Sequence, residues 1–477
     1  MTDLDRVLAH VDDALPRSLE RLFALLSIDS ISTDPAHADS CRRAADLMVD
    51  ELADIGFDAR RHDTPGHPMV LGHHPGAVDG APRLLFYGHY DVQPVDPLPL
   101  WHRPPFEPAL EETAAGTVIR ARGAADDKGQ LMTFVEACRA WKAVTGSLPA
   151  PVTVFLEGEE ESGSPSLVPF LKANLDPLTA DLALVCDTGM WDANTPTVST
   201  MLRGMVGEEL TITGPSLDLH SGMYGGAAIN PIRVLTRILA DLHDDTGRVT
   251  LEGFYDGVDE PSAETLAEWA SLEQDESAFL GAVGLTTPAG EQGRSVLEQV
   301  WSRPTCDVNG IDGGYTGEGF KTVIPSIARA KVSFRLVGRQ DSAAVRQAFE
   351  AHVAARLPAD CTASYTSKDG SPAIVMPVDA PAFRAARDAL TAEWDRPAVQ
   401  AGCGGSIPVV GHIREILGMD SLLVGFMLDD DAIHSPNEKY ALRSFHKGTR
   451  SWVRILDALA RGQSRSQASS AVATAAT

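Results

Sequence analysis

The sequence lacks several features that mark common classes of protein. Basic residues are too few for a broad phosphate-binding face, because 40 Lys and Arg stand against 66 Asp and Glu, a formal net charge of −26. None of the six cysteines forms a CxxC pair, and a chain of 477 residues is too long for a small disulfide scaffold. We therefore expect no nucleic-acid partner, reduced thiols and a cytoplasmic protein.

The N-terminal region has no continuous apolar run. Charges recur every few positions in residues 1–28, so neither a secretory signal nor a membrane span is expected, and no membrane partner. Its apolar residues instead follow helical spacing, which predicts an amphipathic first helix. The chain also has no GxSxG elbow, which argues against a serine hydrolase.

The remaining composition is that of an ordinary globular protein. Hydrophobic residues make up 44% and charged residues 22%, which is enough apolar material for at least one sizeable core. The length suggests about three domains, or two large ones. Solubility is the simplest explanation of the acid excess, although some acids could be metal ligands.

Short apolar runs alternate with helical patterns between about residues 84 and 187. The runs RLLFYG, VTVFLEG and DLALVCD are typical of buried strands, whereas GQLMTFVEACRAWKAV and SLVPFLKANL have helical spacing. A further run, LLVGFM at 422–427, precedes a C-terminal helical pattern. Strands that alternate with helices predict an α/β fold with a mostly parallel sheet sandwiched by helices.

The middle of the chain has a different pattern. GEELTITG and ARAKVSFRLVG alternate polar with apolar residues, as half-exposed antiparallel strands do. We expect an inserted α+β lid or dimerisation domain at 203–385, within a catalytic domain formed by 1–202 and 386–461. Residues 462–477 are small and polar, which predicts a disordered tail.

Acids and histidines follow the predicted strands. His89 and Asp91 form an HxD pattern in which both side chains point to one side, although a loop histidine beside a solvated acid would look the same. RGAADDKGQ places Asp126 and Asp127 at a turn before a helix. Two carboxylates at such a turn would be energetically costly without a nearby cation. Alternatively, they could simply cap the helix.

Three further positions share this location. EGEEESGS ends a buried strand with Glu160 and Glu161, which are either a solvated charge run or a metal ligand beside a general base. Asp187 ends the next predicted strand, where a lone Asp could simply cap a loop, and His434 follows LLVGFM, where it could be incidental. Active sites of parallel sheets lie at these carboxyl ends.

The joint pattern is more informative than any single motif. Two histidines and three carboxylates at one edge of a sheet suit one or two borderline metals such as Zn²⁺ or Mn²⁺. A pair of ions about 3.5–4 Å apart needs a bridging carboxylate. Asp126 is the natural bridge, because it can lie between the His89 and His434 sides.

At these residues the chain resembles the co-catalytic zinc peptidase superfamily of aminoacylases, carboxypeptidase G and dipeptidases. It looks most similar to cytosolic non-specific dipeptidases and carnosinases. The motifs that carry the resemblance run in the family's order from about residue 86 to 440: FYGHYDVQP, RGAADDKG, LEGEEESGS, DLHSGMYGG, GEGFKTVIP, SFRLV, GGSIP and AIHSPNEK.

The resemblance implies a role for each residue of the metal centre. One metal would be held by His89, Asp126 and Asp187, and the other by Asp126, Glu161 and His434. The general base for the water between the metals would be Glu160, and Asp91 would orient His89. The metals would be two divalent ions, Zn²⁺ in the first place, with Mn²⁺ or Co²⁺ as alternatives. The Asp126–Asp127 peptide would be cis.

The resemblance also implies substrate-binding residues. His220 would reach the partner subunit's site in a homodimer and stabilise the oxyanion, although by itself it could be a surface histidine. Thr322, Arg335 and Ser406 would hold the substrate carboxylate, for which the planar fork of Arg is suited. Relatives commonly carry an Arg before GGSIP, where this chain has Gly402 and Cys403.

The sequence thus predicts a metal-dependent hydrolase of dipeptides or similarly small peptides with a free carboxylate. An alternative on the same scaffold is an amidohydrolase acting on N-acyl- or N-carbamoyl-amino acids. A catalytically inactive, metal-stabilised binding protein is a third possibility, against which the complete ligand set argues.

Overall fold

The computed structural model describes residues 1–272, 274–405 and 407–474. The chain divides into two compact units, one formed by Met1–Thr200, Met376–Ala401 and the chain from His412 on, the other by Met201–Val375 and Gly402–Gly411. The insert expected at 203–385 overlaps the second unit, but the chain returns to the first unit earlier than expected. The short stretch Gly402–Gly411 then groups with the second unit again.

The first unit is built on a mixed sheet with strand order β1-β2-β6-β3-β7-β17-β8. Its four central strands β6, β3, β7 and β17 are parallel. The strands of this unit are β1 (Asp58–His62), β2 (Met69–His74), β3 (Leu84–His89), β4 (Ala109–Thr113), β5 (Gly116–Arg120), β6 (Val152–Glu157), β7 (Leu182–Val185), β8 (Thr197–Leu202), β16 (Val399–Cys403), β17 (Ser421–Leu423) and β18 (Lys439–Ala441). This architecture confirms the predicted α/β class.

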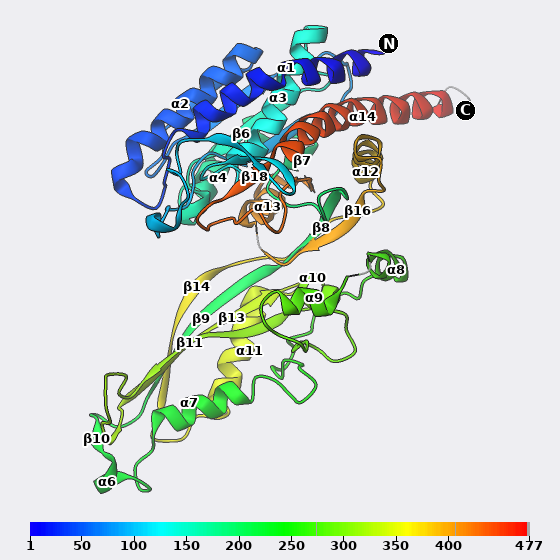
Figure 1. Cartoon of the computed structure of the whole chain (residues 1–477). Coiled ribbons are helices and arrows are strands. Elements are labelled where there is room, and N and C mark those ends of the chain that lie inside the picture. The colour runs from blue at the N-terminus through cyan, green and yellow to red at the C-terminus, as the bar shows by residue number, and fades with distance from the viewer. Residues whose placement is uncertain (273, 406, 475–477) are drawn as a thin grey trace. The chain divides into compact units, whose positions relative to one another are not determined.

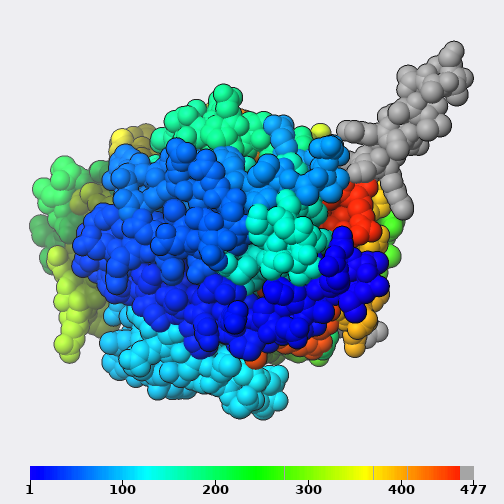
Figure 2. Space-filling view, turned by 90° about the horizontal axis from the view of Figure 1, so that it is seen from above, coloured from blue at the N-terminus to red at the C-terminus, as the bar shows by residue number. Residues whose placement is uncertain are grey.

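Helices cover the sheet of the first unit (Figure 1). They are α1 (Asp3–Leu26), α2 (Ala38–Ile55), α3 (Lys128–Thr145), α4 (Leu167–Ala173), α5 (Leu175–Leu178), α12 (Pro381–Trp394) and α14 (Leu442–Thr474). The predicted amphipathic first helix is α1, which begins with a capping box between Thr2 and Asp5. Seen from above, α1 and α2 form much of the blue surface in Figure 2.

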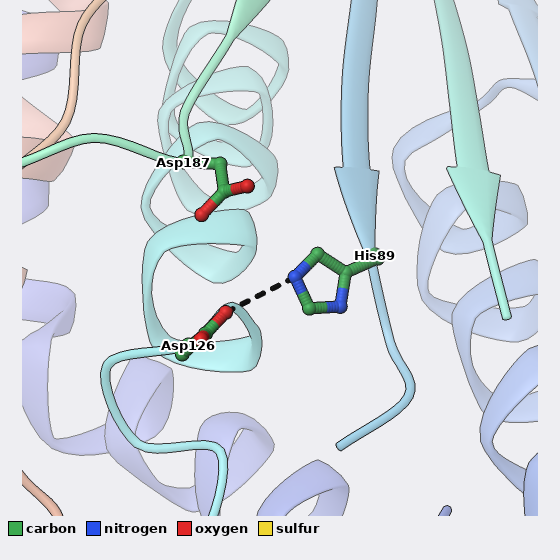
Figure 3. Close-up of side chains that lie close together, drawn as sticks. All are labelled: His89, Asp126 and Asp187. Atoms are coloured by element: carbon green, nitrogen blue, oxygen red, sulfur yellow. Dashed lines mark hydrogen bonds and ion pairs between the residues drawn. The ribbon is translucent and has the colours of Figure 1, made fainter. Parts of the chain in front are cut away.

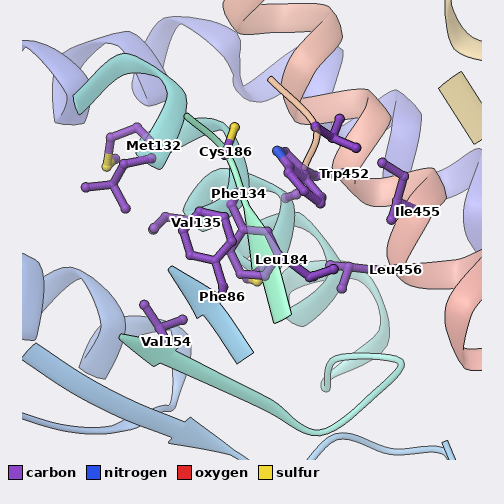
Figure 4. Close-up of a cluster of buried hydrophobic side chains, with 14 of the residues drawn as sticks. Phe86, Met132, Phe134, Val135, Val154, Leu184, Cys186, Trp452, Ile455 and Leu456 are labelled. Carbon is purple, nitrogen blue, oxygen red and sulfur yellow. The ribbon is translucent and has the colours of Figure 1, made fainter. Parts of the chain in front are cut away.

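The alternation along β6 explains how both faces of the sheet become buried. Val154 belongs to the core under α3 and α14, in which Phe134 stacks on Phe86 with ring centroids 3.8 Å apart (Figure 4). The next residue, Phe155, points to the opposite face and stacks on Phe170 of α4 at 5.5 Å. The central strands are therefore sandwiched, so their functional groups reach solvent at the strand ends.

Two sequence expectations differ from the structure. LLVGFM is a strand only as far as Leu423, because Gly425 packs so closely on Thr188 that a Cβ there would lie 1.9 Å from the Thr188 carbonyl oxygen. The N–H of Phe426 donates to the side chain of Gln130 instead of a neighbouring strand, at 2.7 Å. The backbone of α14 continues to Thr474, where the sequence predicts a disordered tail.

The second unit contains an antiparallel sheet of order β11-β13-β9-β14. Alternate residues of β9, such as Val206 and Leu210, face a core shared with α7 and α11. The elements of this unit are β9 (Gly204–Thr213), β10 (Leu219–His220), α6 (Ser221–Tyr224), α7 (Pro231–Ala240), α8 (Ala263–Ser271), α9 (Glu276–Gly281), α10 (Val296–Trp301), β11 (Thr305–Gly313), β12 (Val323–Ile324), β13 (Ile327–Leu336), α11 (Ser342–Ala354), β14 (Thr362–Ser371) and β15 (Ile374–Val375), and α13 (Pro408–His412) follows later in the chain.

Among the described helices, none combines the length and the apolar character needed to cross a lipid bilayer.

Candidate metal centre

The four parallel strands of the first unit end at one edge of the sheet, and each is followed by a polar side chain. His89 is the last residue of β3, Glu160 and Glu161 lie in a short helical turn after β6, and Asp187 follows β7. The loop after β17 carries His434, which has a positive φ of 58°. Because β6, β3, β7 and β17 are neighbours, these side chains meet, as the sequence predicts.

Asp126 joins these side chains from a different element of the first unit. It does not follow a strand of the main sheet but lies in the turn between β5 and α3, and its peptide bond to Asp127 is cis, as the resemblance implies. One carboxylate oxygen, Oδ1, lies 3.1 Å from Nε2 of His89, and the other, Oδ2, lies 2.9 Å from Nε2 of His434. Asp126 therefore stands between the two histidines, with one oxygen directed to each.

Two groups of side chains converge around this shared carboxylate. The ligand atoms of His89, Asp126 and Asp187 all lie within 4.8 Å of one another, and so do those of Asp126, Glu161 and His434. Figure 3 shows His89, Asp126 and Asp187 directed toward a common space. These are the two ligand sets that the resemblance implies, now found in one place.

Further side chains hold the ligands in position. Asp91 is completely buried, with Oδ1 3.4 Å from Nδ1 of His89, and its Oδ2 accepts a hydrogen bond from the backbone N–H of Glu161 at 3.0 Å. Asp91 thus fixes a ligand of each group. Gln93, which the sequence analysis did not single out, donates from Nε2 to Oε2 of Glu161 at 2.8 Å. Its position two residues after Asp91 places it on the same side of the chain.

Carboxylates crowd this edge of the sheet. Burial, together with the charges of Asp126 and Asp127, raises the pKa of Asp187 well above its usual value. Burial and the neighbouring Glu161 raise the pKa of Glu160 to about 7, against the opposing effect of His89. So many acids in a buried place are costly unless positive charge compensates them.

The pKa values of the two histidines are raised as well, by the carboxylates around them. Burial by itself would lower the pKa of His89, but hydrogen bonds to Asp126 and Asp91 raise it well above the usual value. Hydrogen bonds to Asp126 and Glu161 raise the pKa of His434 to about 10. Strong charge coupling thus surrounds Asp126, as expected where a cluster is built to hold cations.

The donor set fits a pair of divalent ions. Imidazole nitrogen and carboxylate oxygen are the donors that borderline metals such as zinc accept, and each group offers three of them. The carboxylate of Asp126 has an oxygen for each group, as a bridge between neighbouring metals requires. This arrangement is suited to activating water for the hydrolysis of a carbonyl compound.

The residues expected to bind substrate lie in the second unit, at separate places. His220 and Val323 pair across the short β10–β12 ladder, and the carbonyl of Thr322 accepts the N–H of Ser221 at 3.0 Å. Arg335 is near the far end of β13, paired with Met205. β13 separates the β10–β12 ladder from Arg335 and spans roughly 25 Å, at about 3.3 Å per residue. Ser406 lies outside the described residues.

Arg203 is a further cation near Arg335 that sequence reasoning missed. It directly precedes β9, two residues before Met205, the partner of Arg335, so both arginines belong to the same face of the sheet. Nε of Arg203 donates to the carbonyl of Gly404 at 2.9 Å. Burial and the charge of Arg335 lower the pKa of Arg203 to about 10. An isolated arginine in an alternating strand gave no sequence signal.

The structure explains why a glycine, Gly402, precedes the GGSIP loop. A Cβ on Gly402 would lie 2.4 Å from Cβ of Trp301, so a larger side chain cannot occupy this position without displacing Trp301. At the position before GGSIP where this chain lacks an Arg, Trp301 therefore occupies the space beside the loop.

The fold and the site together define an α/β protein with a candidate metal centre of histidines and carboxylates. The sequence model of Peptidase family M20/M25/M40 matches residues 85–458, so the chain belongs to this family. The chain is 28% identical over 473 residues to the Cys-Gly metallodipeptidase DUG1 of Saccharomyces cerevisiae, covering 95% of this chain and 97% of that protein.

Two further comparisons support the same family. The cysteinylglycine-S-conjugate dipeptidase of Corynebacterium striatum is 31% identical over 354 residues, covering 72% of this chain and 73% of its own length. The solved structure of an M20 family metallo-carboxypeptidase, Sso-CP2 from Sulfolobus solfataricus, is similar with a TM-score of 0.81 and 28% identity, over 93% of this chain and 99% of that one.

Proposed function

We propose that this protein is a di-zinc dipeptidase that hydrolyses the amide bond of dipeptides with a free carboxylate. The observation that carries the proposal is the position of Asp126, which directs one oxygen to His89 and the other to His434 within two complete ligand groups. One ion would be held by His89, Asp126 and Asp187, and the other by Asp126, Glu161 and His434.

The protein side chains supply binding, orientation and proton transfer. A bound pair of divalent ions would polarise the scissile carbonyl and lower the pKa of the attacking water. By the resemblance, Glu160 is the base that takes the proton from water, and its position beside Glu161 and outside both ligand groups supports this role. The same carboxyl group then gives that proton to the leaving amine.

Recognition of the substrate carboxylate is assigned to arginine. Arg335 offers the planar fork that binds a carboxylate through two hydrogen bonds, and Arg203 brings a second guanidinium to the same face of the sheet. The contact between Arg203 and Gly404 ties this cation to the GGSIP loop. Thr322 and Ser406 are assigned to the same carboxylate by the resemblance.

The separation of the substrate-binding residues supports a homodimer. His220 and Thr322 lie at one end of the second unit and Arg335 at the other, so a single copy of this unit does not bring them together. In a dimer, His220 of one subunit would donate a hydrogen bond to the oxyanion formed in the partner's site. The second unit is then a dimerisation domain and lid.

The surface of the second unit is consistent with this assembly. β11 is an edge strand of the sheet, and an exposed strand edge is available for pairing with another chain. Exposed apolar side chains occur on β11, on the loop that follows it and on α6, namely Val308, Ile311, Tyr315, Phe320 and Met223. Apolar groups of this kind are typical of surfaces that become covered in an oligomer.

The substrate class follows from the relatives as well as from the site. Two relatives are named for Cys-Gly and for cysteinylglycine S-conjugates, so we propose small dipeptides of this kind as the first substrates to test. Cytoplasmic location is proposed as well, supported by five buried cysteines that are free thiols, namely Cys41, Cys138, Cys186, Cys306 and Cys361.

A substrate panel tests the proposal. Purified protein is stripped with a chelator, reloaded with Zn²⁺, Mn²⁺ or Co²⁺, and assayed with Cys-Gly, β-Ala-His, a tripeptide, an N-acetyl amino acid and an N-carbamoyl amino acid. We expect metal-dependent cleavage of dipeptides, with little turnover of the N-acyl and N-carbamoyl compounds. The matched control is Glu160→Gln protein loaded in parallel. Faster turnover of an N-acyl or N-carbamoyl compound would replace the dipeptidase assignment by an amidohydrolase. Faster tripeptide cleavage that releases the C-terminal residue would replace it by a carboxypeptidase.

A further inference from the structure

A buried glutamate outside both ligand groups connects the two loops that meet at the metal centre. Glu438 is completely buried and lies four residues after His434. Its Oε1 accepts hydrogen bonds from the backbone N–H groups of Ala125 at 2.9 Å and of Asp126 at 3.1 Å. Glu438, which lies in the same segment as His434, therefore holds the backbone of Asp126.

The other oxygen of the Glu438 carboxylate also accepts hydrogen bonds from this turn. Oε2 of Glu438 accepts the backbone N–H of Gly123 at 3.0 Å and Nη1 of Arg122 at 2.7 Å. Arg122 is 1% exposed, and its Nη2 donates to the carbonyl of Pro94 at 3.0 Å. One carboxylate thus receives four donors from the turn at 122–126, and three of these are backbone groups.

Backbone contacts of this kind fix where Asp126 stands. Asp126 lies in a turn rather than in a strand, so no sheet ladder determines the position of its backbone. The turn also contains Gly123 with a positive φ of 82°, a conformation that depends on its surroundings. Glu438, from the segment that carries His434, accepts the hydrogen bonds that hold this turn.

From these contacts we propose that Glu438 is a positioning residue that sets the spacing between Asp126 and His434, and through it the affinity for the pair of ions. The proposal rests on the proposed function, because it concerns the same metal centre. Groups that orient metal ligands without touching the metal typically change metal affinity 10–100-fold when they are replaced. Glu438 acts through Asp126 and has no contact with substrate in this proposal.

The central experiment uses Glu438→Gln in the full-length protein. The amide has nearly the same shape, but its NH₂ group would face either the pair Arg122 and Gly123 or the pair Ala125 and Asp126, so that donors oppose donors. The two zinc dissociation constants are measured by competition with a chromogenic chelator, at a temperature where every variant is folded. We expect Glu438→Gln to weaken zinc binding about 10–100-fold.

A matched control separates this effect from a general loss of stability. Glu291 forms a comparable buried pair with Arg303 in the second unit, with Oε2 2.9 Å from Nη2, and the two residues are 5% and 4% exposed. Glu291→Gln removes the same kind of charge and should lower the melting temperature without changing zinc affinity. Zinc affinities in Glu438→Gln within twofold of wild type would overturn the proposal.

A second variant distinguishes positioning from charge. Glu438→Asp keeps the negative charge beside Arg122 but is one methylene shorter, so it cannot reach both donor pairs. We expect weakened zinc binding again and a reduced kcat at saturating metal with little change in KM. Wild-type affinity in Glu438→Asp would overturn the positioning role, and so would failure of both variants to fold, which would assign Glu438 to folding. If wild-type protein bound no zinc, the proposed function would fail first, which is a separate outcome.

Discussion

Nε of Arg203 donates a hydrogen bond to the carbonyl oxygen of Gly404 at 2.9 Å. This contact joins the start of β9 to the GGSIP loop and places a guanidinium on the sheet face that carries Arg335. Just before this loop, Gly402 is packed against Trp301. Arg203 thus places positive charge beside this loop.

Replacement of Arg203 should impair recognition of the substrate carboxylate. A hydrogen bond to a charged group contributes about 1.5–3 kcal/mol, so Arg203→Met should lower kcat/KM for a dipeptide roughly 10–150-fold, mainly through KM. The control substrate is the same dipeptide with a C-terminal amide, which has no carboxylate to bind. Arg203→Met and wild type should cleave the amide at similar rates. An equal loss on both substrates would mean that Arg203 only supports the loop.

Glu160 should be needed for turnover but not for binding the ions. Glu160→Gln preserves the size of the side chain and removes the base, so kcat should fall about 10²–10⁴-fold or more. Metal content, measured by mass spectrometry of the purified protein, should remain at two ions per chain because Glu160 belongs to neither ligand group. Glu161→Gln, a change in the adjacent ligand, is the matched control and should lose metal as well as activity. A near-normal kcat in Glu160→Gln would remove Glu160 from the base role.

Much of this site was predictable because it lies where strand order determines position. His89 and Asp187 follow buried apolar strands that are readily recognised, and parallel strands bring their carboxyl ends together whatever the details of packing. The motif around Asp126 was recognised as well, at a turn before a helix, which is where the structure places it. Strong local patterns thus predicted most of the fold and most of the side chains that converge around Asp126.

The residues that were missed depend on contacts distant in sequence. Glu438 contacts a turn more than three hundred positions earlier, and Arg203 contacts Gly404 about two hundred positions later. No periodicity or spacing in one chain segment reports such a pair. The predicted strand LLVGFM is too long for a similar reason, because the close approach of Gly425 to Thr188 is a tertiary contact. Local pattern therefore predicts ligands better than the groups that support them.

Mixed dimers should reveal whether His220 acts in the partner's site. His220→Ala and Glu160→Ala proteins are each nearly inactive by this proposal. In a mixed dimer, one site combines an intact Glu160 with an intact His220 from the other chain. Random exchange of equal amounts makes half of the dimers mixed, each with one complete site, so about a quarter of wild-type activity should return. Exchange of Glu160→Ala with Asp91→Ala protein is the control and should restore little, because both residues serve the same subunit's site. No recovery with His220→Ala would contradict the trans-subunit role.

Removal of the ions should destabilise the protein in a way that depends on the ligands. Ions that bind only the folded state add RT ln(1 + [L]/Kd), which is about 2.7 kcal/mol for one site at a free metal concentration of 100 Kd. Chelation should therefore lower the melting temperature measured by calorimetry, and added Zn²⁺ should restore it. In His89→Ala protein, which keeps Glu161 and His434 but lacks a ligand of the first group, the metal-dependent shift should be smaller than in wild type. Asp307→Ala, on exposed β11, is the control and should keep the full shift. If zinc shifted wild type and His89→Ala protein equally, the stabilising ions would be bound elsewhere than at the centre around Asp126.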